Sequence, residues 1–102
     1  MTSERTPPEK CTTMTEVRHG VDRLDEAITA LLAERFRYMD AAARIKPDRA
    51  AVRDERRKAE VIAKARRTAD ALGAPGEVVA GVYGQLVEAS IAYEFDRFDR
   101  TR

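Results

Sequence analysis

Apolar residues recur with helical spacing along the first half of the chain. In steps of three and four, one stripe comprises Val17, Val21, Leu24, Ile28, Leu31, Arg35, Tyr38, Ala42 and Ile45. This period of about 3.6 residues predicts a long amphipathic α-helix. Arg35 is the exception within the stripe, because its guanidinium stays charged and its burial requires an anionic partner. Three explanations stay open: a head group that reaches water, a buried Asp or Glu as partner, or an anionic ligand inside a helical bundle.

The two ends of this first helix are marked in the sequence. Thr13 and Glu16 have the spacing of a capping box at its start. The helix runs to about Lys46, because Pro47 cannot continue it. A helix of roughly 33 residues is about 50 Å long at 1.5 Å per residue. One small core cannot support that length, so we expect this helix to pack along a partner helix.

Two shorter helices are predicted in the second half of the chain. The first runs from about Arg53 to Leu72, and Gly73 is a typical C-terminal stop. The second begins at Pro75 and ends near Phe98. The prediction is therefore an all-α fold with three helices per chain, one long and two shorter.

Composition agrees with one small helical domain. The chain has 102 residues, of which 36% are charged and only 6% are aromatic. A core with so few aromatic residues is small for a lone monomer, so we expect a homo-oligomer. Residues 1–12 are polar and contain adjacent prolines, which predicts a disordered N-terminal tail before a helical domain of residues 13–102. The net charge of +1 gives no support to nucleic-acid binding.

Several classes of protein are disfavoured by single features. A lone cysteine, Cys11, excludes an intramolecular disulfide framework and suggests no metal site. The sequence has no apolar run near the ~18 residues of a membrane span. Its N-terminus lacks the apolar centre of a secretory signal. We therefore expect a cytoplasmic protein that does not contact a membrane.

Polar residues also occupy helix faces that should be apolar. Lys58 opens the apolar stripe of the second helix, with Asp54 and Arg57 beside it. Ser90 and Glu94 are four residues apart on the third helix, so they project side by side. Each has an ordinary explanation as a solvated charge, a bonded core hydroxyl or the partner of an arginine. Together they indicate one polar cluster of the size of a small ligand.

Distances along the first helix constrain such a site. Arg18 and Lys46 face the same way but lie about 42 Å apart, and Arg18 and Arg35 lie about 25 Å apart. No small molecule can touch both ends within one chain. If all three cations serve one anionic site, Arg18 comes from a second, antiparallel subunit. A two-fold homodimer with two equivalent shared sites follows.

These residues resemble the all-helical chorismate mutases and their relatives, the isochorismate pyruvate lyases, over about residues 11–98. The run from Cys11 to Asp25 is similar to the lyases. The mutase-like segments are Leu31–Arg35 and Val52–Asp54 with Arg57. The resemblance implies an intertwined dimer of three-helix chains. It also implies that each site combines the residues of one chain with an arginine of the partner.

The resemblance assigns roles to individual positions. Arg18 matches the arginine donated across the dimer and Arg35 matches the arginine of the same chain, and the two hold the substrate's carboxylates. Lys46 matches the lysine that reaches a carboxylate and the breaking ether oxygen. Three further matches line the mutase site: Asp54, Arg57 and Ser90.

Two positions depart from the mutase pattern. Lys58 stands where mutases commonly carry a glutamate that grips the ring hydroxyl. Glu94 stands where a glutamine commonly donates to the ether oxygen, although some family members carry glutamate there. A carboxyl group donates only when it is protonated. Lys58 leaves the identity of the ring substituent open.

The resemblance implies a small dianionic enolpyruvyl substrate and no cofactor or metal. We predict a chorismate mutase, which would hold the compact conformer of chorismate and stabilise charge on its ether oxygen as prephenate forms. The first alternative is an isochorismate pyruvate lyase that yields salicylate and pyruvate, favoured by the N-terminal match and by Lys58. The second is a non-catalytic helical dimer that binds a partner or nucleic acid. Its only support is a few short basic runs, which interleaved acids neutralise.

Overall fold

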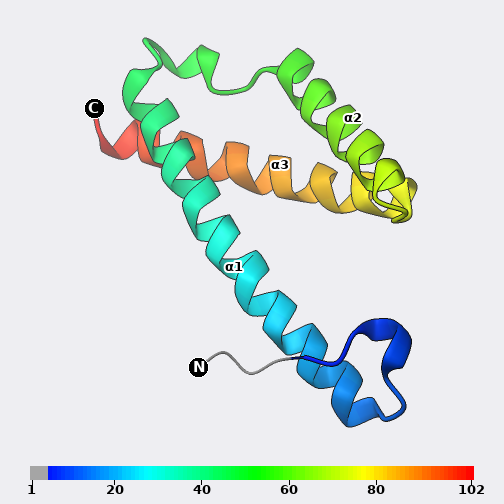
Figure 1. Ribbon diagram of the computed structural model, residues 1–102. Coiled ribbons are helices and arrows are strands. Elements are labelled where there is room, and N and C mark those ends of the chain that lie inside the picture. The colour runs from blue at the N-terminus through cyan, green and yellow to red at the C-terminus, as the bar shows by residue number, and fades with distance from the viewer. Residues whose placement is uncertain (1–4) are drawn as a thin grey trace. The chain divides into compact units, whose positions relative to one another are not determined.

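A computed structural model describes residues 5–102 of the chain, and these residues form helices and turns without a β-strand. The long helix is α1 (Met14–Ile45), followed by α2 (Glu55–Ala71) and α3 (Gly76–Arg100) (Figure 1). Two short 3₁₀ turns, η1 (Pro8–Lys10) and η2 (Arg49–Ala51), lie before and after α1. The predicted all-α chain with one long and two shorter helices is confirmed. In the part of the chain that the structure describes, no helix is long and apolar enough to cross a membrane.

The start of α1 is held by the predicted capping box. The backbone N–H of Glu16 donates to Oγ1 of Thr13 at 3.2 Å, and the N–H of Thr13 donates to Oε1 of Glu16 at 3.1 Å. The N–H of Thr12 also donates to Glu16, at 2.9 Å. The bond from Thr12, followed by the bonds from Thr13, lowers the pKa of Glu16 below its ordinary value.

The turn between α2 and α3 explains why these helices stop and start where they do. Gly73 has a φ of 78°, and its N–H donates to the carbonyl of Asp70 at 3.1 Å. The N–H of Ala74 donates to the carbonyl of Ala69 at 2.8 Å, which completes a Schellman motif. Gly73 is the stop that the sequence predicted. At the other end, α2 begins two residues later than predicted, because the carboxylate of Asp54 accepts from the N–H of Arg57 at 3.0 Å and makes Asp54 the N-cap.

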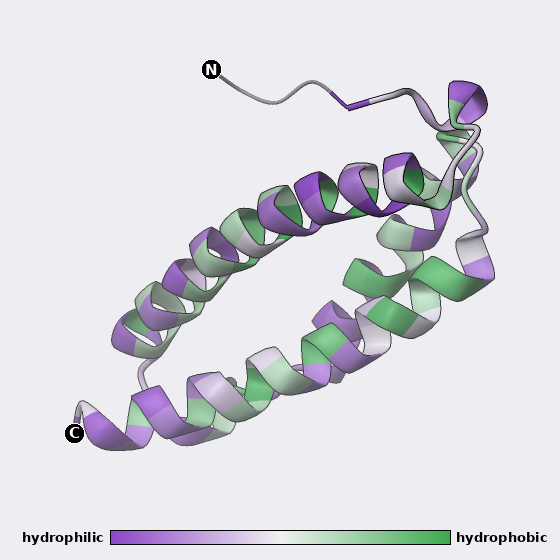
Figure 2. Cartoon of the chain, turned by 90° about the horizontal axis from the view of Figure 1, so that it is seen from below, coloured by the Kyte–Doolittle hydropathy of each residue, from purple (hydrophilic) through white to green (hydrophobic). Residues whose placement is uncertain are grey.

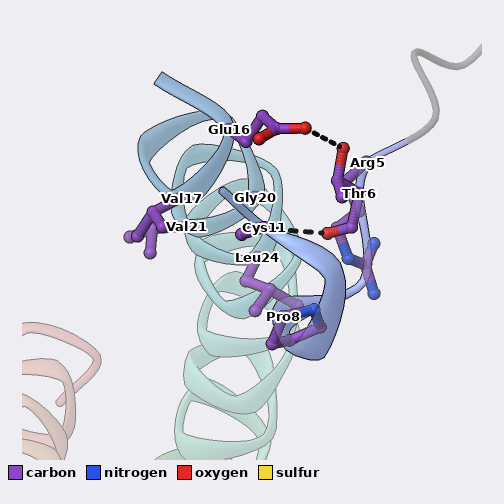
Figure 3. A pocket seen from close by; sticks show the side chains of 9 residues that line it. All are labelled: Arg5, Thr6, Pro8, Cys11, Glu16, Val17, Gly20, Val21 and Leu24. Carbon is purple, nitrogen blue, oxygen red and sulfur yellow. Dashed lines mark hydrogen bonds between the residues drawn. The ribbon is translucent and has the colours of Figure 1, made fainter. Parts of the chain in front are cut away.

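The described residues divide into two compact units, residues 5–36 and residues 37–102. In the N-terminal unit, the segment before α1 lies along its first turns, and Thr6 Oγ1 donates to Glu16 Oε2 at 3.3 Å (Figure 3). Hydrophobic and hydrophilic residues both occur along the helices (Figure 2). The apolar stripe of this unit is largely in solvent, with Ile28 52% exposed and Leu31 65% exposed.

The predicted division into a disordered tail of residues 1–12 and a helical domain of residues 13–102 stays a prediction. Residues 1–4 of that tail lie outside the described residues. Residues 8–10 form η1. Cys11 lies in the same segment, with its Sγ 3.6 Å from the carbonyl oxygen of Pro7.

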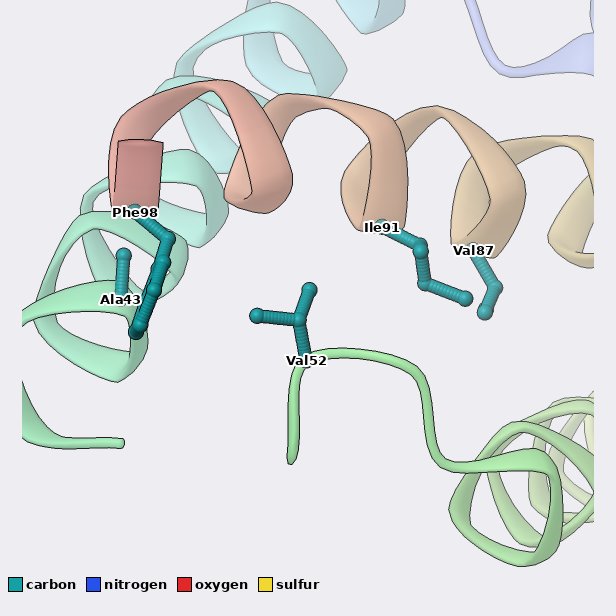
Figure 4. Packing of buried hydrophobic residues seen from close by; sticks show 5 residues of the cluster. All are labelled: Ala43, Val52, Val87, Ile91 and Phe98. Atoms are coloured by element: carbon teal, nitrogen blue, oxygen red, sulfur yellow. The ribbon is translucent and has the colours of Figure 1, made fainter. Parts of the chain in front are cut away.

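The C-terminal unit, residues 37–102, has a small buried core. The main cluster of this core comes from the end of α1, the loop after η2 and one face of α3: Ala43, Val52, Val87, Ile91 and Phe98. Figure 4 shows the side chain of Val52 directed from the loop towards α3. Asp40 ties the end of α1 to α3, since Tyr93 donates to it at 2.7 Å and Arg97 pairs with it at 3.1 Å. The bond to Asp40 raises the pKa of Tyr93.

Candidate active site

An ion pair between a half-buried lysine and a buried glutamate lies where α1 ends against α3. Lys46 is the first residue after α1, and its Nζ lies 2.6 Å from Oε2 of Glu94. The same Nζ donates to the carbonyl of Val52 at 3.3 Å. Glu94 is only 4% exposed. The contact to Lys46 is short but poorly aligned as a hydrogen bond, so the buried Oε2 has no aligned donor among the described residues.

This ion pair has the properties of a functional group rather than of a stabilising one. Removing two charges from water is costly, and the cost is offset only when all lone pairs and protons are satisfied. Here one carboxylate oxygen is buried without an aligned donor. The pair can therefore offer an ammonium donor and a carboxyl group to the same small polar ligand.

Ser90 lies one turn before Glu94 on the same face of α3, as the four-residue spacing predicted. It is 3% exposed, and its Oγ donates to the carbonyl of Leu86 at 2.7 Å. This bond satisfies the hydroxyl proton of a buried side chain. Ser90 thus extends the buried polar face of α3 beyond Glu94.

A second cluster of charges joins the start of α2 to α3. Glu88 accepts from both ends of the Arg53 guanidinium, at 2.9 Å and 3.1 Å. Lys58 Nζ reaches the same carboxylate at 2.6 Å. Arg53 also bonds Glu55 at 2.8 Å. Lys58 is therefore held in place by a carboxylate that comes from α3 and not from its own helix.

Hydrogen bonding in this second cluster shifts the pKa values of Glu88 and Arg53. The hydrogen bonds from Arg53 and then from Lys58 hold the pKa of Glu88 at about 2. The same bonds, Glu88 first and then Glu55, raise the pKa of Arg53 above its ordinary value. Glu88 and Arg53 therefore stay ionised together at neutral pH. The position of Lys58 consequently presents an ammonium where the mutase pattern has a carboxylate.

Asp54 and Arg57 serve α2 itself. The Asp54 carboxylate is the N-cap of that helix, as described above. The Arg57 side chain is 69% exposed and its Nη1 lies 3.7 Å from Glu60. Their predicted contact with a ligand stays a prediction.

Arg18 and Arg35 belong to the N-terminal unit. Both lie on α1, where Arg18 is exposed and Arg35 is half-buried. They are about 25 Å apart at the rise of an α-helix. One small molecule cannot bind both of them in a single chain.

Sequence reasoning missed Glu88, although a signal for it was present. It is the only charged residue between Glu77 and Glu94, in an otherwise apolar and small-residue stretch. A lone charge in such a stretch requires a partner. The partners, Lys58 and Arg53, are about thirty residues earlier, which the periodicity of a single helix does not reveal.

The N-terminal unit also contains a pocket of about 150 Å³ (Figure 3). Its walls are the segment before α1 and the first turns of α1, including Arg5, Val17, Val21 and Leu24. Most of the lining is apolar, and its Glu16 is already bonded by threonines. None of the predicted site residues lines this pocket.

Comparison with known proteins decides the family. A sequence profile described as chorismate mutase type II matches residues 17–95. The chain belongs to the chorismate mutase type II family. The isochorismate pyruvate lyase of Pseudomonas aeruginosa is 32% identical over 95 residues, which make up 93% of this chain and 94% of that protein. The resemblance inferred from the residues is confirmed, and this member of the family is an enzyme of the mutase or lyase kind.

Proposed function

We propose that this family member is a chorismate mutase, which rearranges chorismate to prephenate without a cofactor. The observation that carries the proposal is the pair of half-buried Lys46 with buried Glu94, beside buried Ser90. A cationic donor and a carboxyl group at this position match the two donors to the ether oxygen that the family resemblance implies. Ser90, Asp54 and Arg57 match further mutase positions.

The reaction requires little more than these groups. A pericyclic rearrangement needs no nucleophile, so the protein accelerates it by holding the reactive conformer and stabilising developing charge. As the C–O bond lengthens, negative charge grows on the ether oxygen. Lys46 would donate to that oxygen, and Glu94 would donate to it in its protonated form. These contacts are stronger in the transition state than in the ground state, which is the condition for catalysis.

The carboxylates of the substrate require a different kind of partner. Guanidinium groups bind carboxylates through paired hydrogen bonds, so Arg18 and Arg35 suit a dianion. Their separation along α1 means that one shared site needs Arg35 from one chain and Arg18 from another. We infer an intertwined antiparallel homodimer with two such sites. The exposed apolar stripe of α1 supports this inference, because a second copy would cover it.

Isochorismate pyruvate lyase activity is the second candidate. The Pseudomonas aeruginosa relative carries that activity in its name. Lys58 favours it too, because its ammonium, held 2.6 Å from Glu88, can only donate, whereas the glutamate of mutases accepts from the ring hydroxyl. Chorismate and isochorismate differ in the position of that hydroxyl. Residue 58 is therefore the position at which the two substrates would be distinguished.

Purified protein incubated separately with chorismate and isochorismate tests both candidates. We expect prephenate to form from chorismate, and the loss of the ultraviolet absorbance of chorismate measures the rate. The variant Lys46→Ala should lose this activity, whereas Lys64→Ala, which removes an exposed lysine of α2, should keep it. If isochorismate yields salicylate and pyruvate while chorismate yields no prephenate, the protein is a lyase and the mutase proposal is wrong. If neither substrate yields a product, the remaining alternative is a non-catalytic binding module.

A further inference from the structure

The carbonyl of Ala43 has lost its usual partner. In an α-helix, the N–H of the residue four positions later donates to each carbonyl, and for Ala43 that residue is Pro47, which has no N–H. Ala43 is 1% exposed, so its surroundings are closed to bulk water. Nη1 of Arg102 donates to this carbonyl at 3.0 Å. A side chain from beyond α3 thus replaces the missing backbone donor.

The same guanidinium also holds the main chain of Lys46. Nη2 of Arg102 donates to the carbonyl of Lys46 at 2.7 Å. The guanidinium lies 3.7 Å from the centroid of the buried Phe98 ring, which restricts its plane. A planar fork with two directed donors fixes the orientation of both carbonyls, which a single ammonium cannot do.

Lys46 is consequently fixed at both ends. Its ammonium is held by Glu94 and by the carbonyl of Val52, and its main chain is held by Arg102. The backbone N–H of Lys46 still donates to the carbonyl of Ala42 at 2.9 Å, and Arg102 adds the hold on the carbonyl side of Lys46, next to Pro47. The direction of the main chain decides where a four-carbon side chain can place its charge.

We infer that Arg102 is a positioning residue for Lys46. The inference rests on the proposed function, because it assumes that Lys46 acts on the substrate. Arg102 itself is not expected to touch the substrate. Without it, Lys46 would keep its charge but lose its alignment with the ether oxygen. We therefore expect Arg102→Ala to lower kcat about tenfold or more, with KM changed by less than about threefold.

Arg100 provides the matched control. It lies two residues before Arg102 and its Nε pairs with Asp96 of the same helix at 2.8 Å, in an exposed position. Arg100→Ala removes the same side chain from the same end of α3 and should leave kcat unchanged. Arg102→Lys offers one point donor for two carbonyls and should fall between wild type and Arg102→Ala. Equal kcat values for Arg102→Ala and Arg100→Ala would overturn the inference.

A double variant separates positioning from simple stabilisation of α1. Pro47→Ala in the Arg102→Ala background restores a backbone donor to the carbonyl of Ala43 but leaves the carbonyl of Lys46 without Arg102. We expect the Tm to recover and kcat to stay low. Recovery of both would mean that Arg102 only caps the helix, and would refute a positioning role.

A readout independent of turnover keeps this inference distinct from the proposed function. The chain has four lysines, Lys10, Lys46, Lys58 and Lys64, so reductive ¹³C-methylation gives a simple NMR spectrum. The Lys46 signal is the one absent from Lys46→Arg. Arg102→Ala should shift that signal and Arg100→Ala should not. An unmoved Lys46 signal would overturn the inference even in an active enzyme, whereas a shifted signal in a protein inactive on both substrates would refute only the proposed function.

Discussion

Residues 37–102 bury a small apolar core of their own, although Ile45, Leu72 and Val78 stay exposed, whereas the apolar stripe of residues 5–36 lies largely in solvent. In the C-terminal unit, Val52 is 3% exposed and Phe98 is 7% exposed. In the N-terminal unit, Ile28 and Leu31 are 52% and 65% exposed on a stripe of the same helical period. The difference shows that an apolar stripe of helical period predicts an amphipathic helix without telling what covers its apolar face. A stripe this long favours a second copy as that cover.

The two units also differ in the chemistry that they offer. The C-terminal unit contains the charges that would act on a reacting oxygen, Lys46 and Glu94, and it pairs them within one chain. The N-terminal unit contributes the guanidinium groups of Arg18 and Arg35, which suit carboxylates. We propose that the N-terminal unit recognises the substrate across the dimer and that the C-terminal unit stabilises the transition state.

The largest effect is expected from a charge placed on the exposed stripe. Ile28→Asp would put a carboxylate into the proposed interface of both chains, at a cost of about 2–4 kcal/mol per chain. The dimer should dissociate and activity should be lost, as sedimentation and prephenate assays would show. Val78→Asp is the control, because Val78 is 63% exposed in the first turn of α3, where a carboxylate is favourable. An active dimer of Ile28→Asp would remove the stripe from the interface.

A large loss is also expected for Lys46→Ala. Its contact with the ether oxygen strengthens in the transition state, so kcat should fall by about 10²–10³ and KM should rise much less. Steady-state kinetics on chorismate separate the two constants. If KM alone changes, Lys46 is a carboxylate anchor, and the division of roles between the two units fails.

A smaller effect, with the opposite sign at neutral pH, is expected for Glu94→Gln. The amide is a donor at every pH, whereas a carboxyl group donates only when protonated. The variant should keep or raise kcat at neutral pH, by up to about tenfold, and its pH–rate profile should be flat. Wild-type kcat should rise as the pH falls from neutral towards mildly acidic. Loss of activity at all pH values in the variant would mean that Glu94 works as a carboxylate.

The smallest effect concerns Glu88 and stability in acid. Its pKa in the folded chain is lowered to about 2 by Arg53 and Lys58, so its contribution to stability is present above the ordinary value near 4.5 and is lost as the pH falls towards 2. Glu88→Gln should lower the Tm slightly at neutral pH, and the two Tm curves should converge below about pH 3. Asp99→Asn, which breaks the exposed pair with Arg49, serves as a comparison with a carboxylate held by one cation. Parallel Tm curves for wild type and Glu88→Gln down to pH 2 would contradict this assignment.

Local signals in the sequence predicted most of the helices. The capping box of Thr13 and Glu16, the break at Pro47 and the stop at Gly73 are each set by neighbours within a few residues, and the structure contains all three. The start of α2 is the exception. The sequence predicts a helix from about Arg53, whereas Asp54 is the N-cap and α2 begins at Glu55.

The site was less accessible to sequence reasoning. The spacing of Ser90 and Glu94 placed them on one face of α3, but it did not pair Glu94 with Lys46. The bonds of Lys58 to Glu88 and of Arg102 to Lys46 join residues 30 and 56 positions apart. Such contacts depend on how helices pack, and no local period encodes them.

Complementation between two inactive chains tests the central claim most directly. Arg18→Ala and Arg35→Ala should each be inactive as purified homodimers. Mixed in equal amounts, unfolded and refolded together, they should recover about a quarter of wild-type prephenate formation, because half the dimers are hybrids and each hybrid has one intact site. The control is Arg35→Ala alone, unfolded and refolded in the same way. Recovery near a quarter supports Arg18 acting across the dimer, and no recovery from properly folded mixed dimers would contradict it.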